Sequence, residues 1–461
     1  MLDYQRLQSF EQDEFRFLGA HAYFNDSQCF LLSLDGTSLI ISKALLSELE
    51  TGTISDDFAY KLFQRGFATA FNNKRYEDRL LEIRPSLFMI DFTTRCNCNC
   101  IYCLRHFENV GESISVKQLD KITDYIIAYC KKHGVFHISF QPWGGEPMIE
   151  LNKIIHCKQR FDAAGIDAAF TIQTNGLLLN LDNYKKLKAN GIHIGISIDG
   201  VAEVHDAHRV DVKGGKTHER IVNNIKAIMD SDDNCEIGAL SVNSSYSLHH
   251  ITEDVDYLVN ELGISNIKLN LVHPSGSIKF DHSILISKEQ IPEYVDLIID
   301  AVIKQILDGK RCYESNIADK LCNLLGVPNE NMCNSSGCRG GLSFVSFDRE
   351  GNIYPCEMIG RTDMKLGNIE DDIDLIELIR KAYGTNPYYE PRKTQECEDC
   401  PFFYFCRGGC KACSLSYGKD AADIDEIECA INKAIYPRLV EIILEKPRLA
   451  EKLSDYKFIL D

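Results

Sequence analysis

Six apolar segments alternate with six helical patterns between residues 87 and 307, and this alternation limits the possible fold more than any other feature. The first segment, residues 87–93, is almost uninterrupted, as in a parallel strand covered on both faces. We predict further strands at residues 136–140, 168–172, 193–198, 236–242 and 266–272. We predict helices from about residue 116 to 133 and near 149–163, 182–190, 217–230, 248–262 and 288–307. Such alternation predicts an α/β fold, with a parallel sheet that is open or closed into a partial (β/α)6 barrel.

The chain has other patterns on either side of this segment. Residues 30–42 predict a β-hairpin around Asp35-Gly36, and Ser42 and Ser55 could cap two short helices after it. After residue 307 the alternation stops, and helical periodicity returns at about residue 431. We therefore predict a small strand-then-helix domain (1–85), the α/β core (86–307), a loop-rich domain (308–430) and a helical tail (431–461) docked on the surface.

The charge of the chain argues against nucleic acid as a partner. There are 50 Lys and Arg residues against 68 Asp and Glu residues, which gives a formal charge of −18. A protein that binds phosphate backbones needs clustered basic residues instead. The N-terminus is polar and acidic, unlike a signal peptide, and no apolar run approaches the roughly 18 residues that span a membrane. We expect a cytoplasmic protein with no membrane partner, in which thiols stay reduced and clustered cysteines bind metal.

Eleven of the 19 cysteines fall into three groups. The groups are Cys96, Cys100 and Cys103; Cys333, Cys338 and Cys356; and Cys397, Cys400, Cys406 and Cys410 with Cys429. The other eight are scattered, and isolated cysteines are usually small apolar side chains. Zinc is one interpretation of the groups, because four thiolates at CxxC spacing suit it. An iron–sulfur cluster is the other, since a cluster held by three cysteines leaves one iron open to a substrate or cofactor.

Polar or glycine-rich residues follow the predicted strands at their carboxyl ends. The first cysteine group follows the first strand, and Gly144-Gly145-Glu146-Pro147 follows the second. Thr174-Asn175-Gly176 follows the third strand, and Ser197-Ile198-Asp199-Gly200 ends the fourth. In parallel α/β sheets the chemistry lies at this edge. The sequence therefore predicts an active site there.

These motifs together resemble a known family. Cys96-x3-Cys100-x2-Cys103, with the aromatic Tyr102 before the last cysteine, resembles the radical S-adenosylmethionine (SAM) motif, and GGEP and SIDG strengthen the resemblance. The C-terminal cysteine spacing resembles the SPASM extension of that family. The resemblance covers residues 87–430. It implies a peptide- or protein-modifying enzyme with one SAM-binding and two auxiliary [4Fe–4S] clusters.

The resemblance also implies ligand sets. Cys96, Cys100 and Cys103 would hold the cluster whose open iron binds SAM, which is cleaved reductively to methionine and a 5′-deoxyadenosyl radical. The auxiliary clusters would be held by Cys333, Cys338, Cys356 and Cys410, and by Cys397, Cys400, Cys406 and Cys429. An external one-electron reductant of the flavodoxin or ferredoxin type is implied as a partner. Cys98 is outside the family spacing, and Cys413 is unassigned.

The same resemblance implies residues that bind SAM. These are Tyr102, Gly144, Gly145, Glu146, Thr174, Asn175, Ser197, Asp199 and Arg209. Glu146 would accept hydrogen bonds from the SAM ammonium, Ser197 and Asp199 would bind the ribose, and Arg209 would clamp the carboxylate. A surface salt bridge is the alternative role for Arg209. Glu357, directly after Cys356, stands where sulfatase maturases have an aspartate that accepts a proton. It is a general base or a polar neighbour of the cluster.

Three functions are weighed. The N-terminal unit resembles the leader-recognition elements of ribosomal peptide maturases, which add a peptide as a strand to a sheet edge. This favours a maturase that abstracts a hydrogen atom from a precursor peptide with a leader, and installs a thioether or carbon–carbon crosslink. The unit could instead be a structural cap on the barrel. The second function is an anaerobic sulfatase maturase that converts Cys or Ser to formylglycine. The third is a non-catalytic iron–sulfur scaffold or electron carrier, for which the SAM-binding residues would be dispensable.

Overall fold

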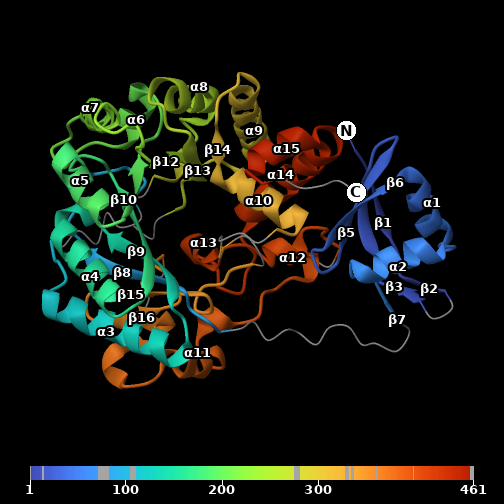
Figure 1. The fold of residues 1–461 in the computed structure, drawn as a ribbon, viewed down its shortest axis with the longest axis horizontal. Helices are drawn as coiled ribbons and strands as arrows, with labels where there is room; N and C mark the ends of the chain where they lie inside the picture. Colours follow the sequence, from blue (N-terminus) through green and yellow to red (C-terminus); the bar gives the residue numbers. More distant parts are fainter. Residues whose placement is uncertain are drawn as a thin grey trace.

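A ten-stranded sheet forms the centre of the molecule (Figure 1), in a computed structural model that describes residues 2–12, 15–70, 83–103, 111–274, 281–327, 332–333, 337–358, 362–397 and 399–456. Its order is β14-β13-β12-β11-β10-β9-β8-β15-β16-β17. The strands are β8 (Leu87–Thr93), β9 (His137–Gly144), β10 (Asp167–Thr174), β11 (His193–Ser197), β12 (Ile237–Asn243), β13 (Asn266–Leu271), β14 (Tyr313–Glu314), β15 (Phe344–Phe347), β16 (Asn352–Tyr354) and β17 (Gly367–Asn368). All neighbours from β14 to β15 are parallel, and β16 and β17 are antiparallel additions. The predicted fold class, a mixed α/β protein with a largely parallel sheet, is confirmed.

Helices line the outer side of this sheet (Figure 1). They are α3 (Val116–His133), α4 (Leu151–Ala163), α5 (Leu181–Ala189), α6 (Ala202–His208), α7 (His218–Met229), α8 (Ile251–Asp256) and α9 (Ile291–Leu307). Short 3-10 segments are η2 (Pro147–Glu150), η3 (Leu248–His250), η5 (His282–Ile284), η6 (Lys288–Gln290), η7 (Thr362–Met364), η8 (Ile369–Asp371), η9 (Pro387–Tyr389) and η10 (Gln395–Cys397), and η4 (Tyr257–Glu261) is a π-helical turn. Local chemistry sets the ends of α3: the Ser115 hydroxyl accepts a hydrogen bond from Gln118 N at 3.1 Å, and Gly134 ends the helix with a φ of 66°. The predicted strands and helices of this segment are all present, and α6 is an addition.

Aromatic side chains fix α4 to the sheet. Phe140 and Phe170, on neighbouring strands, stack with ring centroids 4.3 Å apart, and Phe161 of α4 lies 5.5 Å from Phe140. All three are buried, and each contributes about 1.5–3 kcal/mol through its removal from water. This packing aligns β9 and β10, whose carboxyl ends carry predicted site residues.

The N-terminal unit contains two small antiparallel sheets. The first, in the order β1-β4-β5-β6, is built from β1 (Asp3–Leu7), β4 (Ala20–Phe24), β5 (Gln28–Ser33) and β6 (Ser38–Ser42). The second, in the order β2-β3-β7, is built from β2 (Phe10–Gln12), β3 (Phe15–Phe17) and β7 (Ala68–Ala70). Helices α1 (Lys43–Thr51) and α2 (Asp56–Gln64) cover them. The predicted hairpin is confirmed by the pairing of β5 with β6, and Ser42 caps α1 as predicted.

The N-terminal unit contacts the C-terminal part rather than standing apart from it (Figure 1). Tyr23 of β4 stacks on Phe402 with ring centroids 6.0 Å apart, and Arg6 forms an ion pair with Asp399. Tyr23 and Phe30 belong to the same buried cluster as the core of the large sheet. The two segments are therefore held together by apolar packing as well as by charge.

The C-terminal part continues the central sheet through β15, which pairs with β8 across the predicted boundary at residues 307 and 308. Its helices are α10 (Ser315–Leu325), α11 (Leu375–Tyr383), α12 (Phe403–Cys406), α13 (Lys411–Ser416), α14 (Glu426–Glu445) and α15 (Pro447–Ser454). The last long helix begins at Glu426 rather than near residue 431. Its Tyr436, Leu439 and Ile443 are fully buried against α9, α10 and β5, so the expected docking on the surface is wrong. The domain boundaries themselves stay predictions.

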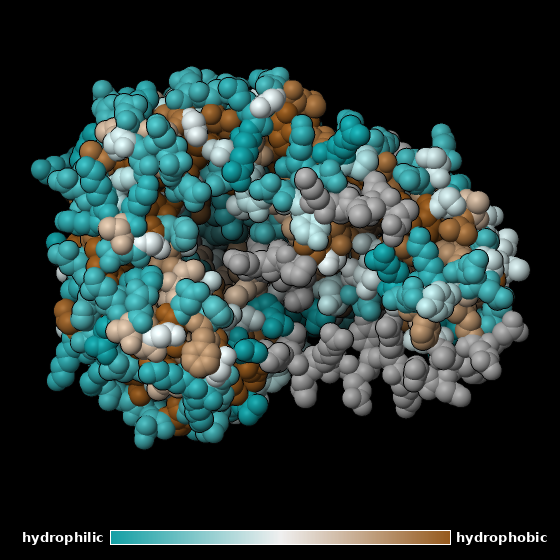
Figure 2. Space-filling model, viewed as in Figure 1, coloured by the Kyte–Doolittle hydropathy of each residue, from teal (hydrophilic) through white to brown (hydrophobic). Residues whose placement is uncertain are grey.

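The visible surface is mostly hydrophilic, with hydrophobic residues scattered in small areas (Figure 2). Among the residues that the structure describes, no helix is both long and apolar enough to cross a bilayer.

Candidate functional site

The predicted three-cysteine loop follows β8 at the carboxyl edge of the sheet. The thiols of Cys96, Cys100 and Cys103 lie close enough to interact electrostatically, and all three residues are partly exposed. Cys98 is buried beside them, and its thiol donates a hydrogen bond to Cys100. This hydrogen bond, helped by the charge of Arg209, lowers the pKa of Cys100 to about 7 although burial opposes it. The loop thus presents three thiols together, one of them biased toward its thiolate.

Two glycines bring the end of β9 against this loop. A Cβ on Gly144 would overlap the carbonyl oxygen of Thr93, and its φ of 134° favours glycine. A Cβ on Gly145 would lie 2.7 Å from the carbonyl carbon of Arg95 and nearer still to its oxygen. Backbone hydrogen bonds join the segments, from Gly145 N to Thr93 O at 2.7 Å and from Glu146 N to Arg95 O at 2.8 Å. The glycines therefore serve a close backbone contact within the protein, and their predicted contact with SAM stays a prediction.

Glu146 joins the ends of β9 and β10. Its Oε1 accepts hydrogen bonds from Met148 N at 2.9 Å and Thr174 Oγ1 at 2.7 Å, and its Oε2 accepts one from Asn175 N at 2.8 Å. Only 1% of Glu146 is exposed, and burial raises its pKa in spite of these hydrogen bonds. A carboxylate has about four acceptor positions, so one remains for a further donor. Its predicted bond to the SAM ammonium is compatible with these contacts but stays a prediction.

Asn175 and Ser197 lie on the same edge. Asn175 Nδ2 donates to Asn97 Oδ1 at 2.6 Å and lies 4.0 Å from Cys96 Sγ, so this side chain touches the cysteine loop. Ser197 Oγ accepts a hydrogen bond from Gln173 Nε2 at 3.0 Å and is 8% exposed. Both have protein partners, and their contacts with SAM stay predictions.

Asp199 and Arg209 contact each other. Arg209 Nε donates to Asp199 Oδ2 at 3.1 Å, Tyr102 OH donates to the same oxygen, and Val242 N donates to Asp199 Oδ1 at 3.0 Å. Burial alone would raise the pKa of Asp199, but the charges of Arg209 and His205 and these hydrogen bonds outweigh it and lower the pKa. Asp199 is 0% exposed and Arg209 is 7% exposed, so the alternative of a surface salt bridge is wrong for Arg209. The predicted ribose contact of Asp199 is untested, and its carboxylate already has three protein donors.

The first predicted auxiliary ligand set comes together. Cys338, Cys356 and Cys410 belong to one apolar cluster with Tyr388, whose hydroxyl lies 3.0 Å from Cys338 Sγ. Cys333 lies near Cys338 and Cys410, close enough to interact electrostatically. Glu357 Oε2 accepts a hydrogen bond from Cys356 Sγ at 3.1 Å. The sequence therefore predicted a set of cysteines that the fold does bring together.

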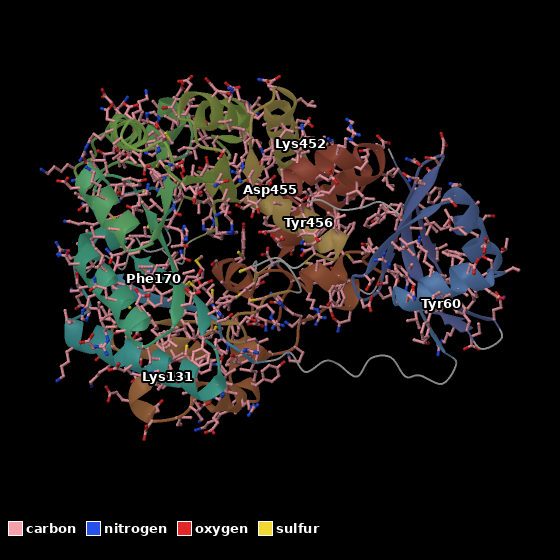
Figure 3. The ribbon with its side chains drawn as sticks, viewed as in Figure 1. Tyr60, Lys131, Phe170, Lys452, Asp455 and Tyr456 are labelled. Atoms are coloured by element: carbon pink, nitrogen blue, oxygen red, sulfur yellow. The ribbon has the colours of Figure 1, made fainter. Side chains whose placement is uncertain are left out.

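The second set is brought together in part. Cys397, Cys400 and Cys429 lie close enough to interact electrostatically. Cys406 interacts with Glu428 and Asn432, which stand on α14 as Cys429 does. Within the described residues, no three His, Cys, Asp or Glu side chains are arranged to hold a single metal ion. Sulfur atoms gather near the middle of the molecule in Figure 3.

Sequence reasoning left Cys413 unassigned and missed two other side chains of this region, His273 and Lys320. Cys413 lies beside Cys410, and its Sγ is 3.2 Å from Nδ1 of His273. His273 lies two residues after the end of β13, so the strand-end rule could have found it. Lys320 is 3% exposed, donates to Glu428 and Asn432, and interacts electrostatically with Cys406. No short motif marks this lysine.

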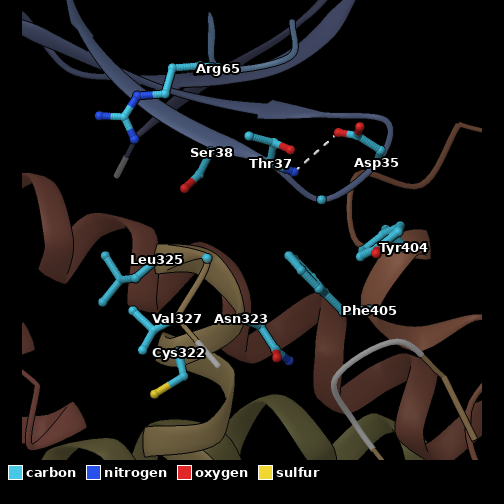
Figure 4. Close-up of a pocket in the computed structure, with 12 residues that line it drawn as sticks. Asp35, Thr37, Ser38, Arg65, Cys322, Asn323, Leu325, Val327, Tyr404 and Phe405 are labelled. Carbon is cyan, nitrogen blue, oxygen red and sulfur yellow. Dashed lines mark hydrogen bonds between the residues drawn. The ribbon is translucent and has the colours of Figure 1, made fainter. Parts of the chain in front are cut away.

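A pocket of about 480 Å³ lies elsewhere, between the β5–β6 hairpin and the end of α10 (Figure 4). Thr37 and Arg65 line one side of it, and Leu325 and Val327 line the other. None of the predicted site residues lines this pocket.

Comparison with known proteins identifies the central part of the chain. Residues 90–240 match the model of the radical SAM superfamily. These residues form a radical SAM domain. The domain contains the three-cysteine loop, the Gly144-Gly145-Glu146 turn and the Asp199–Arg209 pair. The family implies a [4Fe–4S] cluster and SAM as cofactors, and the count of three clusters stays a prediction.

Beyond the radical SAM domain, relatives share more of the chain. The cysteine-type anaerobic sulfatase-maturating enzyme of Clostridium perfringens is 23% identical over 77% of this chain and 98% of its own length. The structure of native anSMEcpe with bound AdoMet is 22% identical, with a TM-score of 0.66, and covers 78% of this chain and 99% of its own. SuiB of Streptococcus suis bound to precursor peptide SuiA is 16% identical, with a TM-score of 0.55, over 88% of this chain and 99% of its own. The two structural likenesses show a shared fold.

The donor set suits the implied cofactors. Three soft thiols at one loop fit an iron–sulfur cluster, which cysteine thiolates hold, better than a hard cation that prefers oxygen ligands. The polar strand ends of the radical SAM domain lie around this loop and connect it to Glu146 and Asn175.

Proposed function

We propose that this radical SAM enzyme modifies a ribosomally synthesised precursor peptide that carries a leader. The observation behind the proposal is the share of this chain that each of two similar proteins covers. The sulfatase-maturating enzyme covers 77% of this chain with 98% of its length, whereas SuiB covers 88% with 99% of its length. SuiB is a protein with a structure bound to a precursor peptide. The N-terminal unit supplies a sheet with β1 and β6 at its ends, where an extended leader could add a strand.

In this proposal the residues at the carboxyl edge hold the cofactors. Cys96, Cys100 and Cys103 would hold the cluster, and Glu146 has an acceptor position left for the SAM ammonium. When bound, the cluster and SAM supply the radical that removes a hydrogen atom from the substrate. The protein's own residues fix the loop, exclude water and orient the substrate. Asn175 and the two glycines hold the loop in place.

The C-terminal cysteines would hold two auxiliary clusters that accept an electron or bind the substrate. Cys338 and Tyr388 belong to an apolar cluster, and the Lys411 ammonium lies 5.0 Å from the centroid of the Tyr388 ring. In this proposal the apolar side chains would limit the access of water to a radical product. Glu357, whose Oε2 accepts a hydrogen bond from Cys356 Sγ, would be the proton acceptor there. The product would be a thioether or carbon–carbon crosslink, and a flavodoxin- or ferredoxin-type protein would supply electrons.

The first test is SAM cleavage. Anaerobically reconstituted protein with dithionite should release 5′-deoxyadenosine and methionine, and Cys100→Ala should release neither. The matched control is Cys235→Ala, which changes a cysteine outside the three groups. If the unchanged protein forms no 5′-deoxyadenosine, the non-catalytic iron–sulfur scaffold becomes the better interpretation.

The second test identifies the substrate class. The protein is co-expressed with short reading frames encoded beside its own gene, and each peptide is examined by mass spectrometry. A peptide that loses two hydrogen atoms and shows a crosslink in its fragment spectrum supports the proposal. The same loss should disappear when the leader segment of that peptide is deleted.

A sulfatase maturase is the second candidate, and higher similarity favours it. The anSMEcpe structure matches with a TM-score of 0.66 against 0.55 for SuiB. This function predicts that a sulfatase-derived peptide with Cys or Ser gains an aldehyde that a hydrazide probe captures. Aldehyde formation on that peptide, with no change to any leader-bearing peptide, would replace the proposal by this second function.

A further inference from the structure

The buried ion pair of Asp199 and Arg209 contacts the three-cysteine loop, and nothing so far explains what the pair does for that loop. Asp199 is 0% exposed and Arg209 7% exposed, and their side chains are joined by the 3.1 Å bond from Arg209 Nε to Asp199 Oδ2. Tyr102, inside the cysteine loop, donates its hydroxyl to the same carboxylate oxygen. A buried carboxylate that binds both a loop residue and an arginine fixes the two relative to each other.

The free end of the guanidinium is directed at a cysteine. Arg209 Nη1 lies 4.0 Å from Cys100 Sγ, and the guanidinium carbon lies 5.2 Å from the centroid of the Tyr102 ring. An arginine is charged at every accessible pH, and its planar head is suited to stacking on an aromatic ring. The pair with Asp199 and the ring of Tyr102 leave the guanidinium little freedom to turn away from the sulfur.

The backbone supports the same arrangement. Ile101 N donates to His208 O at 3.0 Å, and Asn99 N donates to Val210 O at 2.8 Å. Cys98 and Asp211 form an isolated antiparallel bridge. The segment that carries Arg209 is therefore paired along the cysteine loop, and the position of the guanidinium follows from that pairing.

We propose that Asp199 and Tyr102 are positioning residues that hold the Arg209 guanidinium against Cys100, where its charge favours the reduced state of the cluster. Reduction adds one negative charge to a cluster that three thiolates already make anionic. A fixed cation in a buried site stabilises the added charge with little screening by solvent or salt. The role differs from a clamp on the SAM carboxylate, because it acts on the cluster when SAM is absent. It rests on the proposed assignment of Cys96, Cys100 and Cys103 as ligands.

The test is a redox titration of full-length, reconstituted protein, followed by electron paramagnetic resonance. The signal that changes on addition of SAM identifies the SAM-binding cluster, and the dissociation constant of SAM is measured in parallel. Variants are Arg209→Gln, which removes the charge, and Arg209→Lys, which keeps it. Tyr102→Phe removes only the hydroxyl bond to Asp199. The matched control is Arg220→Gln, which removes an equal charge from an exposed side chain that pairs with Asp211 at 3.2 Å.

We expect the ratio of reduced to oxidised cluster in Arg209→Gln to fall about tenfold at a fixed potential, a shift of ~59 mV for one electron. Arg209→Lys should recover most of this loss, Tyr102→Phe should show a smaller fall, and Arg220→Gln should match the unchanged protein. An unchanged potential in Arg209→Gln, with or without weaker SAM binding, overturns the inference. If Arg209→Gln does not fold, Tyr102→Phe decides by the same criterion. Unchanged protein with no SAM-responsive cluster would instead refute the proposed function.

Discussion

Replacing Gly145 by alanine should damage the cysteine loop far more than such a small change would elsewhere in the sheet. The added Cβ would lie 2.7 Å from the carbonyl carbon of Arg95 and 2.9 Å from Thr94 O, whereas ordinary contact begins at 3.4 Å. Both atoms belong to backbone, which has no flexible end that could turn aside. Arg95 directly precedes Cys96, so the overlap is relieved only by moving the loop that carries the thiols.

The expected loss of stability follows from these distances. Moving the Arg95 carbonyl carbon from 2.7 Å to 3.4 Å is a shift of about 0.7 Å. The 2.8 Å hydrogen bond from Glu146 N to Arg95 O would lengthen to about 3.5 Å, beyond the usual limit of about 3.2 Å. Glu146 is 1% exposed, and a buried donor left without a partner costs about 1–3 kcal/mol, so we expect Gly145→Ala to lose about 1–3 kcal/mol of stability.

The assay compares Gly145→Ala with Gly238→Ala in β12 of the same sheet. A Cβ on Gly238 would meet Asn266 O at 3.6 Å, an ordinary contact, so this control should change stability by less than about 1 kcal/mol. Urea unfolding gives the free energies of the apo-proteins, and iron and sulfide content after reconstitution report on the loop. Equal stability and equal iron content in the two variants would refute the argument that Gly145 is needed for the close contact.

Three other substitutions have definite expected results. Burial raises the pKa of Asp254 to about 8, so the folded protein keeps a proton that the unfolded chain loses near pH 4. Asp254 should therefore make stability fall as pH rises from 4 to 8, by up to about 1.4 kcal/mol for each pH unit, and Asp254→Asn should make the fall measured by urea unfolding smaller by this contribution. Lys320→Met leaves the Glu428 carboxylate without its buried cation and should lower the free energy of unfolding by about 3 kcal/mol. Adding Glu428→Gln should restore part of this loss in the double variant, and additive losses would contradict the pairing. Glu357→Gln should lower product formation about 100-fold while iron content and SAM cleavage persist, as general-base loss requires; unchanged product formation would exclude it as a base.

The strands, the helices and the place of the site were predictable because each depends on local patterns. The apolar segment at residues 87–93 became β8 with the same bounds, since a strand covered on both faces needs an uninterrupted apolar run. The strand-end rule placed Glu146 and Asp199 at one edge because parallel strands end together. Short spacing likewise predicted that Cys397 and Cys400 would meet, since two intervening residues keep their thiols close.

The contacts within the site were not predictable, because they join residues far apart in sequence. Tyr102 and Asp199 are 97 positions apart, and nothing near either residue marks the hydrogen bond between them. Lys320 and Glu428 are 108 positions apart and meet only because α10 packs on α14. The expected surface position of the last helix failed for a related reason. The apolar residues of α14 are spread around the helix rather than gathered in one stripe, and its burial depends on contacts with the distant elements α9, α10 and β5.

The three-cysteine loop and the first auxiliary cysteine group share the same structural support. Strand β8 ends in the loop with Cys96, and Met89 on that strand packs in the apolar cluster with Cys338 and Cys356. From the other side, His273 at the end of β13 reaches Cys413, which touches Cys410. Both groups thus contact β8, the loop at the carboxyl end of the strand and the auxiliary group at Met89 near its start, so a displacement of β8 reaches both. The iron content of Gly145→Ala should therefore be measured separately for the three-cysteine loop and for the auxiliary cluster that Cys338, Cys356 and Cys410 are predicted to hold. Iron loss confined to the loop means that the loop moves independently, and joint loss means that β8 and both cysteine groups move as one unit.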